Sequence, residues 1–201
     1  LAAAIIGRTA AYGLHLDENR RAGLRVNVRC PVRSQSDFGA LGALVGKVAR
    51  DRVPYFTGLD ACSEVSLKAL GAAMAASGAV ALYHVAGVTP ESALSGILLD
   101  DIETLVVEDL APAYAALGSD VDRIDLVWFG CPHADLAEIA RVVRLLGGRQ
   151  VKAALWVTTA REIRDQAVKK GLVRALEACG GRVVADMCVV ILPYHLISSP
   201  R

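Results

Sequence analysis

Apolar runs and amphipathic stretches alternate at a regular period through the last third of the chain, and no other feature limits the possible folds as strongly. The runs IDLVWFG, KAALWVTT and RVVADMCVVI are typical of strands, and ADLAEIARVVRLLGG and REIRDQAVKKGLVRALEACGG, between them, are typical of helices that end at glycines. Strands joined through helices make right-handed crossovers and lie parallel in one sheet. Hydrophobic residues make up 54% of the chain and aromatic residues only 5%, which suits strands covered on both faces. We therefore expect an α/β fold with a parallel sheet and helices on both faces.

The first part of the chain is less regular. It is loop-rich to about residue 62, although LRVNVRC alternates like a half-buried strand and Asp37 is placed to cap a helix through FGALGALVGKVAR. From residue 63 the pattern predicts a helix at EVSLKALGAAMAA, a strand at AVALYHV and a helical apolar face over residues 102–117. We expect two regions, a loop-rich segment 1–62 and one continuous parallel α/β region 63–201.

One long uncharged stretch raises the question of a membrane helix. The span from Ala69 to Pro90 carries no charge apart from the one possible on His84. Ser77 and Gly78 divide it into an Ala-rich half and a Val/Leu/Tyr half, which favours a helix, a turn and a buried strand. Lys plus Arg is 22 and Asp plus Glu is 21, so a formal charge of +1 gives no basic excess for nucleic acid or for a membrane surface. We predict that the chain binds neither.

The five cysteines are odd in number, widely spaced and without a CxxC pair. This pattern argues against a disulfide framework and favours a reduced, cytoplasmic setting. The chain begins at Leu1 in the middle of a pattern, with no start methionine and no capping residue, so we expect a piece of a longer protein.

Two of these cysteines fall at strand ends. Cys131 follows the first strand of the alternating region, and Cys188 lies near the end of the next strand but one. The carboxyl ends of parallel strands meet at one edge of the sheet, where ligands gather, so both thiols are expected there. Pro132 suits the first turn of the following helix, which would place the Cys131 thiol at the positive helix end and favour a thiolate for a metal or for nucleophilic attack. A buried, space-filling cysteine is the alternative for each.

Other polar residues are candidates for the same site or for a second one. Asp186 lies inside an apolar strand, and a buried carboxylate needs a partner, so it indicates a polar site near Cys188. His133 is a candidate ligand or acid, or an ordinary residue at a helix start. The stretch GLHLDENR gathers charges that suit either a solvated loop or a clamp in which Arg20 grips a carboxylate or phosphate. Thr89 before Pro90 is expected to cap a helix through its hydroxyl.

The segments GLHLDENR, HVAGVTPES, FGCPHADLAEI and ADMC, in this order and at these intervals, resemble the aconitase X family. The likeness runs from IGRTAAYGLH to about Val190. It implies an aconitase-like fold and an enzyme that removes water from a small hydroxy carboxylate. Two features depart from the family: Met187 stands where threonine is expected, and the tail LPYHLISSPR does not continue the family's pattern.

The resemblance also implies a cofactor and a set of site residues. Family members hold an iron–sulfur cluster, of the 2Fe–2S or 4Fe–4S type, on three cysteines. Two of these correspond to Cys131 and Cys188, in the region 63–201 that is expected to bind the cluster. The third would lie upstream of Leu1, so the fragment is expected to be inactive on its own. We expect His133 to assist the leaving oxygen and a small swivelling domain or subunit to complete the site. The residues expected to contact the substrate are His15, Asn19, Arg20, Thr89 and Glu91.

Two activities are associated with the family, cis-3-hydroxy-L-proline dehydratase and mevalonate 5-phosphate dehydratase. We expect the first, with pyrroline-2-carboxylate as the product, because the Ala/Arg-rich composition suggests a bacterium and no Gly-rich phosphate loop or basic cluster is present. Phosphomevalonate dehydration is the alternative. Two rivals belong to other classes: a cysteine-nucleophile enzyme that uses Cys131 with His133 or a distant histidine, and an inert structural or binding fragment.

Overall fold

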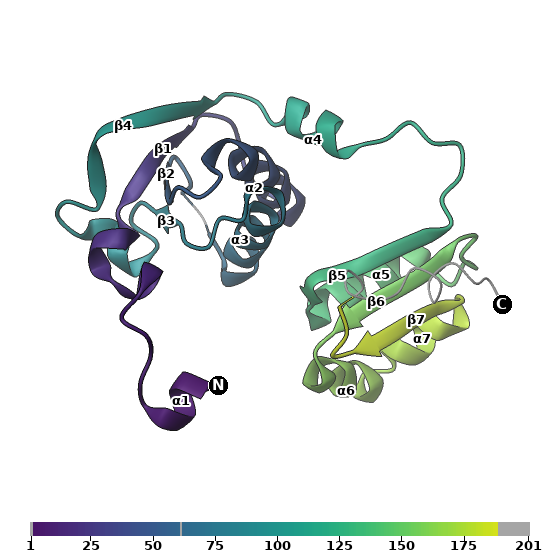
Figure 1. The fold of residues 1–201 in the computed structure, drawn as a ribbon. Helices are drawn as coiled ribbons and strands as arrows, with labels where there is room; N and C mark the ends of the chain where they lie inside the picture. The colour runs from purple at the N-terminus through teal and green to yellow at the C-terminus, as the bar shows by residue number, and fades with distance from the viewer. Residues whose placement is uncertain (1, 61, 189–201) are drawn as a thin grey trace. The chain divides into compact units, whose positions relative to one another are not determined.

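The computed structural model describes residues 2–60 and 62–188 (Figure 1). Contacts divide the chain into two compact units, Leu1–Ser119 (the first unit) and Asp120–Arg201 (the second unit). This division is one of packing. The expected functional division at residue 62 stays a prediction, and the divergent tail from Val190 lies outside the described residues.

The first unit is built on a four-stranded sheet in the order β3-β2-β1-β4, with every pair parallel. Helices α2 and α3 pack on one face of it. The elements in chain order are α1 (Ala2–Ile6), the 3-10 helices η1 (Gly13–His15) and η2 (Asp17–Arg20), β1 (Ala22–Val28), α2 (Gln35–Ala49), β2 (Pro54–Thr57), α3 (Glu64–Gly78), β3 (His84–Val85), the 3-10 helix η3 (Pro90–Ala93), β4 (Leu98–Val107) and α4 (Ala111–Leu117).

Alternation along β1 sets the core of this unit, as the sequence predicts. Leu24, Val26 and Val28 are buried against α2 and α3, and the residues between them are half-buried. The two helices approach closely because glycines face the contact. A Cβ at Gly46 would lie 2.8 Å from the Met74 carbonyl oxygen, which is too close for any larger residue.

Helix α2 begins one turn earlier than expected. Ser34 is the N-cap, and Asp37 is the third helical residue of a capping box in which each side chain accepts the other's backbone amide. These bonds, with a hydrogen bond from Tyr114, hold the pKa of Asp37 at about 2, below its ordinary value of 3.8. The prediction that Asp37 itself caps the helix is therefore wrong.

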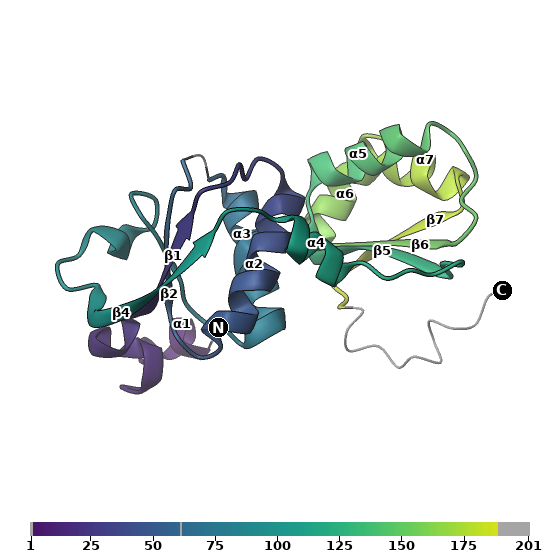
Figure 2. The ribbon, with the colours of Figure 1, turned by 90° about the horizontal axis from the view of Figure 1, so that it is seen from above.

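The second unit has a three-stranded parallel sheet in the order β5-β6-β7. Its helices lie on one face of this sheet (Figure 2). Leu155, Val157 and Val183 project from the strands into a core with Ile139 and Leu176 of the helices. The elements are β5 (Leu126–Ala134), α5 (Leu136–Leu146), β6 (Ala154–Thr159), α6 (Arg161–Lys169), α7 (Leu172–Ala178) and β7 (Gly181–Ala185).

The α/β class and the parallel arrangement are confirmed, with two differences. The strands form two sheets rather than one, and in the described residues helices cover one face of each sheet. The uncovered face of β1 carries Arg25 and Asn27, which is why it needs no apolar cover.

Three element predictions are wrong in detail. Residues 102–117 are the second half of strand β4 followed by α4, because alternating exposed residues and Pro112 disfavour one long helix. The long expected helix after β6 breaks into α6 and α7 at Gly171, whose φ of +71° ends the first helix. Only His84 and Val85 of AVALYHV form a strand.

The division of the uncharged stretch at Ser77-Gly78 is confirmed. Helix α3 ends at Gly78, and Ala79 takes a left-handed conformation before the chain turns toward β3. No helix among residues 2–60 and 62–188 is long and apolar enough to cross a bilayer.

Candidate functional site

The two candidate cysteines lie at the same edge of the second unit's sheet. Cys131 is in the last part of β5, and Cys188 follows the end of β7 by three residues. Because β5, β6 and β7 are parallel, both residues lie at the carboxyl ends of their strands, with β6 between them. The predicted placement is confirmed. Cys188 lies past the strand rather than inside it.

The carboxyl end of β5 departs from regular pairing. Its register against β6 shifts between Phe129 and Ala134. Gly130 allows this departure, since its φ is +113° and a Cβ there would lie 2.1 Å from the Thr158 carbonyl oxygen. The stretch that carries Cys131 and His133 is thereby released from the ladder.

Two threonine hydroxyls at the end of β6 replace the missing ladder bonds. Thr158 Oγ1 donates to the Gly130 carbonyl at 2.8 Å and accepts the Trp128 indole N–H at 3.0 Å. Thr159 donates to the Ala134 carbonyl. Both threonines are fully buried, so these bonds offset the cost of burying the hydroxyls. Sequence analysis passed over this pair, although two threonines ending an apolar strand were a visible signal.

His133 links the end of β5 to the segment that follows β7. Its Nε2 donates to the Met187 carbonyl oxygen at 3.1 Å. Met187 immediately precedes Cys188, and His133 is two residues after Cys131. The bond therefore holds the two cysteine-bearing segments side by side.

Asp186 anchors the same segment from the other side. Its carboxylate accepts the backbone N–H of Arg161 and the Arg161 Nε–H, each at 2.9 Å, at the start of α6. Its backbone N–H donates to the Thr159 carbonyl oxygen at 2.9 Å. The expected partner of Asp186 is thus Arg161. The expectation of a buried carboxylate inside a strand is wrong, since the side chain is 45% exposed.

Cys131 does not lie at a helix N-terminus. It belongs to β5, and α5 begins at Leu136 after a capping box made by Asp135 and Glu138. The predicted position of Cys131 at the positive end of a helix is therefore wrong. Exposure of the thiol is what makes it available to a ligand.

The donors at this edge fit part of a cluster site. Cys131 is exposed, Cys188 is half-buried, and neither is in a disulfide. Thiolates are the ligands that iron–sulfur clusters require. Within the described part of the chain, no three His, Cys, Asp or Glu side chains gather closely enough to hold a metal ion, so a complete site needs a donor from elsewhere.

The remaining cysteines lie in apolar surroundings. Cys179 is buried before the turn into β7. Cys30 and Cys62 pack against the first unit's core, and burial raises the pKa of both thiols. None of the three has the exposure of Cys131.

Two of the five expected substrate residues of the first unit, Arg20 and Glu91, bond to each other. Arg20 donates from Nε to the Glu91 carboxylate at 2.9 and 3.0 Å, and from another nitrogen to the Leu14 carbonyl at 2.8 Å. Hydrogen bonding to Glu91 raises the pKa of Arg20, and the same pairing lowers the pKa of Glu91. Arg20 precedes β1, so this pair lies at the amino end of the sheet.

The other three residues have local partners. Asn19 donates to the Gly13 carbonyl at 2.9 Å, and exposed His15 lies 3.4 Å from the Thr9 hydroxyl. Thr89 does not cap η3; its hydroxyl accepts the Val85 amide at 2.9 Å instead. A substrate role for these residues stays a prediction.

His84 is a residue of this cluster that sequence analysis missed. It is 1% exposed, and its Nε2 donates to the Arg20 carbonyl oxygen at 2.8 Å. Its position in an apolar run was the available signal, because a buried imidazole needs a polar partner.

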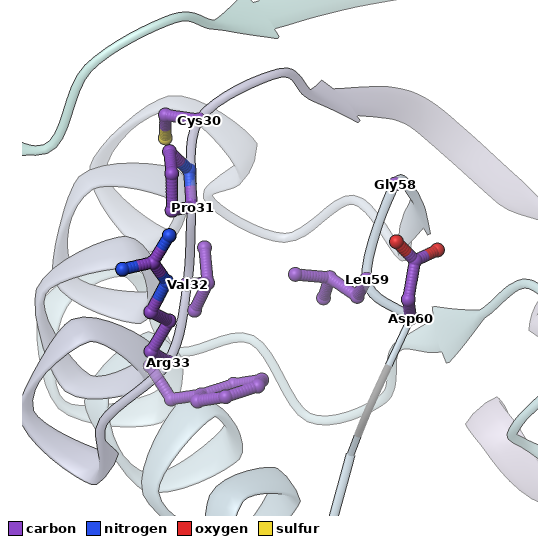
Figure 3. Close-up of a pocket in the computed structure, with 8 residues that line it drawn as sticks. Cys30, Pro31, Val32, Arg33, Gly58, Leu59 and Asp60 are labelled. Atoms are coloured by element: carbon purple, nitrogen blue, oxygen red, sulfur yellow. The ribbon is translucent and has the colours of Figure 1, made fainter.

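A small pocket lies at the opposite, carboxyl end of the first unit's sheet (Figure 3). Its volume is about 200 Å³, and the loops after β1 and β2 form its walls. Gly58 lets these loops meet, since a Cβ there would lie 2.1 Å from the Val28 carbonyl oxygen. Arg33 and Asp60 lie on opposite walls, with Val32 and Leu59 between them. The opposed charges favour neither an anion nor a cation alone.

Comparison with known proteins agrees with the division of the chain into two compact units. Family models described as the aconitase X second domain and the aconitase X third domain match residues 22–115 and 124–198. The boundary between them falls where the two compact units divide.

Characterised relatives carry two names. The phosphomevalonate dehydratase large subunit of Methanothermobacter thermautotrophicus is 49% identical over 96% of this chain and 48% of its own length. The cis-3-hydroxy-L-proline dehydratase of Hypocrea jecorina is 35% identical over 92% of this chain and 33% of its own length. The chain spans about half the length of the phosphomevalonate dehydratase subunits that it matches.

A solved structure supports the same assignment. The crystal structure of Thermococcus kodakaraensis aconitase X in its holo form superposes with a TM-score of 0.84 at 40% identity, over 96% of this chain and 51% of that one. Both family models, the named relatives and this structure agree, and the chain belongs to the aconitase X family.

Proposed function

We propose that the full protein is a hydro-lyase that removes water from a small hydroxy carboxylate, and that this chain supplies two thiolate ligands of its iron–sulfur cluster, Cys131 and Cys188. The observation that carries the proposal is the bond from His133 to the Met187 carbonyl, which holds the two cysteine segments together. The third ligand comes from outside the described residues.

The cluster would supply the Lewis acid. When bound on Cys131, Cys188 and a third ligand, it would stabilise the departing hydroxide, which is a poor leaving group on its own. Three protein thiolates leave one coordination position of the cluster open, and four would close it.

The chain's own residues hold that centre in place. Gly130 and Thr158 fix the bulge of β5 that presents Cys131, and His133 and Asp186 fix the segment that presents Cys188. Arg20 already bonds Glu91 through Nε and Nη2, so a substrate carboxylate would compete with Glu91 for these donors or use the remaining N–H groups of the guanidinium.

Phosphomevalonate is the substrate that the comparisons favour. Identity reaches 49% with a phosphomevalonate dehydratase large subunit and 35% with the cis-3-hydroxy-L-proline dehydratases. The Ala/Arg-rich composition led us to expect cis-3-hydroxy-L-proline instead. Composition reflects the base content of the genome and does not describe the substrate pocket. The relatives' designation as large subunits supports a small subunit as partner. Five cysteines outside disulfides support a reducing compartment such as the cytoplasm.

The test uses the full-length protein with its partner, reconstituted anaerobically with iron and sulfide. Cys131→Ser and Cys188→Ser should each lower iron content and the rate of water loss by more than the roughly 10–100-fold that loss of an outer-shell partner costs. Cys62→Ser, a matched change at a half-buried thiol of the first unit, should keep both.

Two outcomes would count against the proposal. Full iron content in both cysteine variants would overturn the ligand assignment. A colourless protein that is active without iron and inactivated by alkylation of Cys131 would instead favour the cysteine-nucleophile mechanism. Parallel assays with phosphomevalonate and cis-3-hydroxy-L-proline decide the substrate.

A further inference from the structure

We propose that His133 is a positioning residue that sets the place of Cys188, by holding the carbonyl group of Met187 across the end of β6. The inference rests on the proposed function only in taking Cys188 as a ligand. Its geometric part concerns the chain alone and can be measured without metal.

The path of the chain gives the first argument. The sheet order is β5-β6-β7, so β5 and β7 do not pair with each other. The last bond of the ladder joins the Asp186 amide to the Thr159 carbonyl of β6. Asp186 then takes a φ of +54°, which turns the chain out of the strand. Because Met187 next meets His133 of β5, the segment must pass over the carboxyl end of β6.

Side-chain bonds hold this crossing at two points. On the α6 side, the Asp186 carboxylate binds both the backbone and the guanidinium of Arg161. On the β5 side, the His133 ring donates to the Met187 carbonyl. Loss of the His133 bond would remove the side-chain anchor of Met187 on the Cys131 side of the crossing and leave the Asp186 anchor on the α6 side.

The direction of the bond defines the role of the imidazole. A carbonyl oxygen only accepts, so the Nε2 proton of His133 is used in this bond. That proton holds the backbone rather than the leaving oxygen of a substrate. A positioning role predicts that an amide donor can replace the ring, whereas an acid role predicts that it cannot.

The experiment compares three substitutions of one residue in full-length, iron-free, reduced protein. His133→Gln keeps an N–H donor at a similar reach, His133→Phe keeps a ring without a donor, and His133→Asn keeps an amide that is too short. Each protein is treated with a short bifunctional thiol reagent, and the bridged Cys131–Cys188 peptide is measured by mass spectrometry.

A control of the same type lies at the other end of the sheet. Gln150 Nε2 donates to the Ala178 carbonyl at 2.8 Å, also between distant parts of the second unit. Gln150→Leu therefore loses a comparable side-chain-to-carbonyl bond without touching the cysteine edge.

The expected result is a fall in bridging of roughly fivefold in His133→Phe and His133→Asn, the population change for loss of one neutral hydrogen bond. His133→Gln should stay within about twofold of the parent, and Gln150→Leu should match it. Iron uptake after reconstitution should follow the same order. If His133→Phe fails to fold, the Asn and Gln pair decides the result.

Other outcomes overturn the inference or its basis. Parental bridging in the Phe and Asn variants would overturn the positioning role and leave the ligand assignment standing. An equal loss in Gln150→Leu would show general loosening and would also overturn it. Absence of bridging in the parent protein would mean that the thiols do not face one site, and the proposed function would fall with it.

Discussion

Polar side chains gather at the amino end of the first unit's sheet and at the carboxyl end of the second unit's sheet. The two groups of side chains have different roles. In the first, Arg20 and Glu91 pair with each other, so their charges are already satisfied. In the second, the polar groups of Thr158, His133 and Asp186 hold backbone, and the thiol of Cys131 stays exposed. A cluster of charged residues in a sequence can therefore form a structural ion pair as readily as a binding or catalytic site. A site is better recognised by what its supporting bonds leave available.

Substitution of Gly130 should cause the greatest loss of stability among the changes considered for the two units. Gly130→Ala should lower the stability of the second unit by about 3 kcal/mol or more, because the new Cβ meets the Thr158 carbonyl in a left-handed conformation. Gly148→Ala is the control, since Gly148 has a φ of +79° and nothing within 4 Å of its Cβ position. It should cost about 1 kcal/mol, from the backbone alone. Equal melting temperatures for the two variants would show that β5 does not depend on this close approach.

Thr158 should give the next largest effect. Thr158→Val leaves the Trp128 indole N–H and the Gly130 carbonyl without their partner, at a cost of about 1–3 kcal/mol in denaturant unfolding. Thr57→Val in the first unit removes only a 3.4 Å bond to the Val26 carbonyl and should cost less than about 1 kcal/mol. A larger loss at Thr57 would reverse the contrast between the two units.

The Arg20–Glu91 pair should contribute about 1 kcal/mol, since both side chains are more than a quarter exposed. Its pH dependence has a definite sign. Hydrogen bonding to Arg20 lowers the pKa of Glu91 from its ordinary value of 4.5, so the stabilisation is present above pH 4.5 and is lost as the pH falls through the lowered pKa.

Glu91→Gln should remove that acid-dependent part of the stability, measured as the change in melting temperature between neutral and acid buffer. An unchanged pH dependence would show that the pair contributes nothing. A large rise in KM with no loss of stability would instead favour the predicted substrate role of Glu91.

The smallest effect is expected at Arg33, on the wall of the first unit's pocket. The side chain is exposed and forms no ion pair among the described residues, so Arg33→Gln should change stability by less than about 0.5 kcal/mol. A larger loss in thermal unfolding would mean that the charges facing this pocket interact across it.

How far the sequence predicts this molecule depends on whether the decisive contacts are local. The run from β5 to β6 was predictable because its apolar period changes clearly between strand and helix. Parallel topology then placed Cys131 and Cys188 at one edge without further information. The break at Gly171 was not predicted, since glycine in an otherwise helical pattern is often tolerated.

The side-chain bonds that support the two polar clusters could not be predicted from the sequence, because they join residues far apart in the chain. His133 meets Met187 across 54 residues, and Arg20 meets Glu91 across 71. Neither pair belongs to a periodic pattern. The bulge at Gly130 depends on Thr158, which lies on another strand, so the exposure of Cys131 could only be read from the fold.

The most direct test of the central claim is X-ray absorption at the iron edge, on anaerobically reconstituted full-length protein and its Cys188→Ser variant. If Cys131 and Cys188 bind the same iron centre, the variant should lose sulfur neighbours around iron, by replacement with a lighter oxygen atom or by loss of the metal. An unchanged sulfur shell with full iron occupancy in Cys188→Ser would contradict the account.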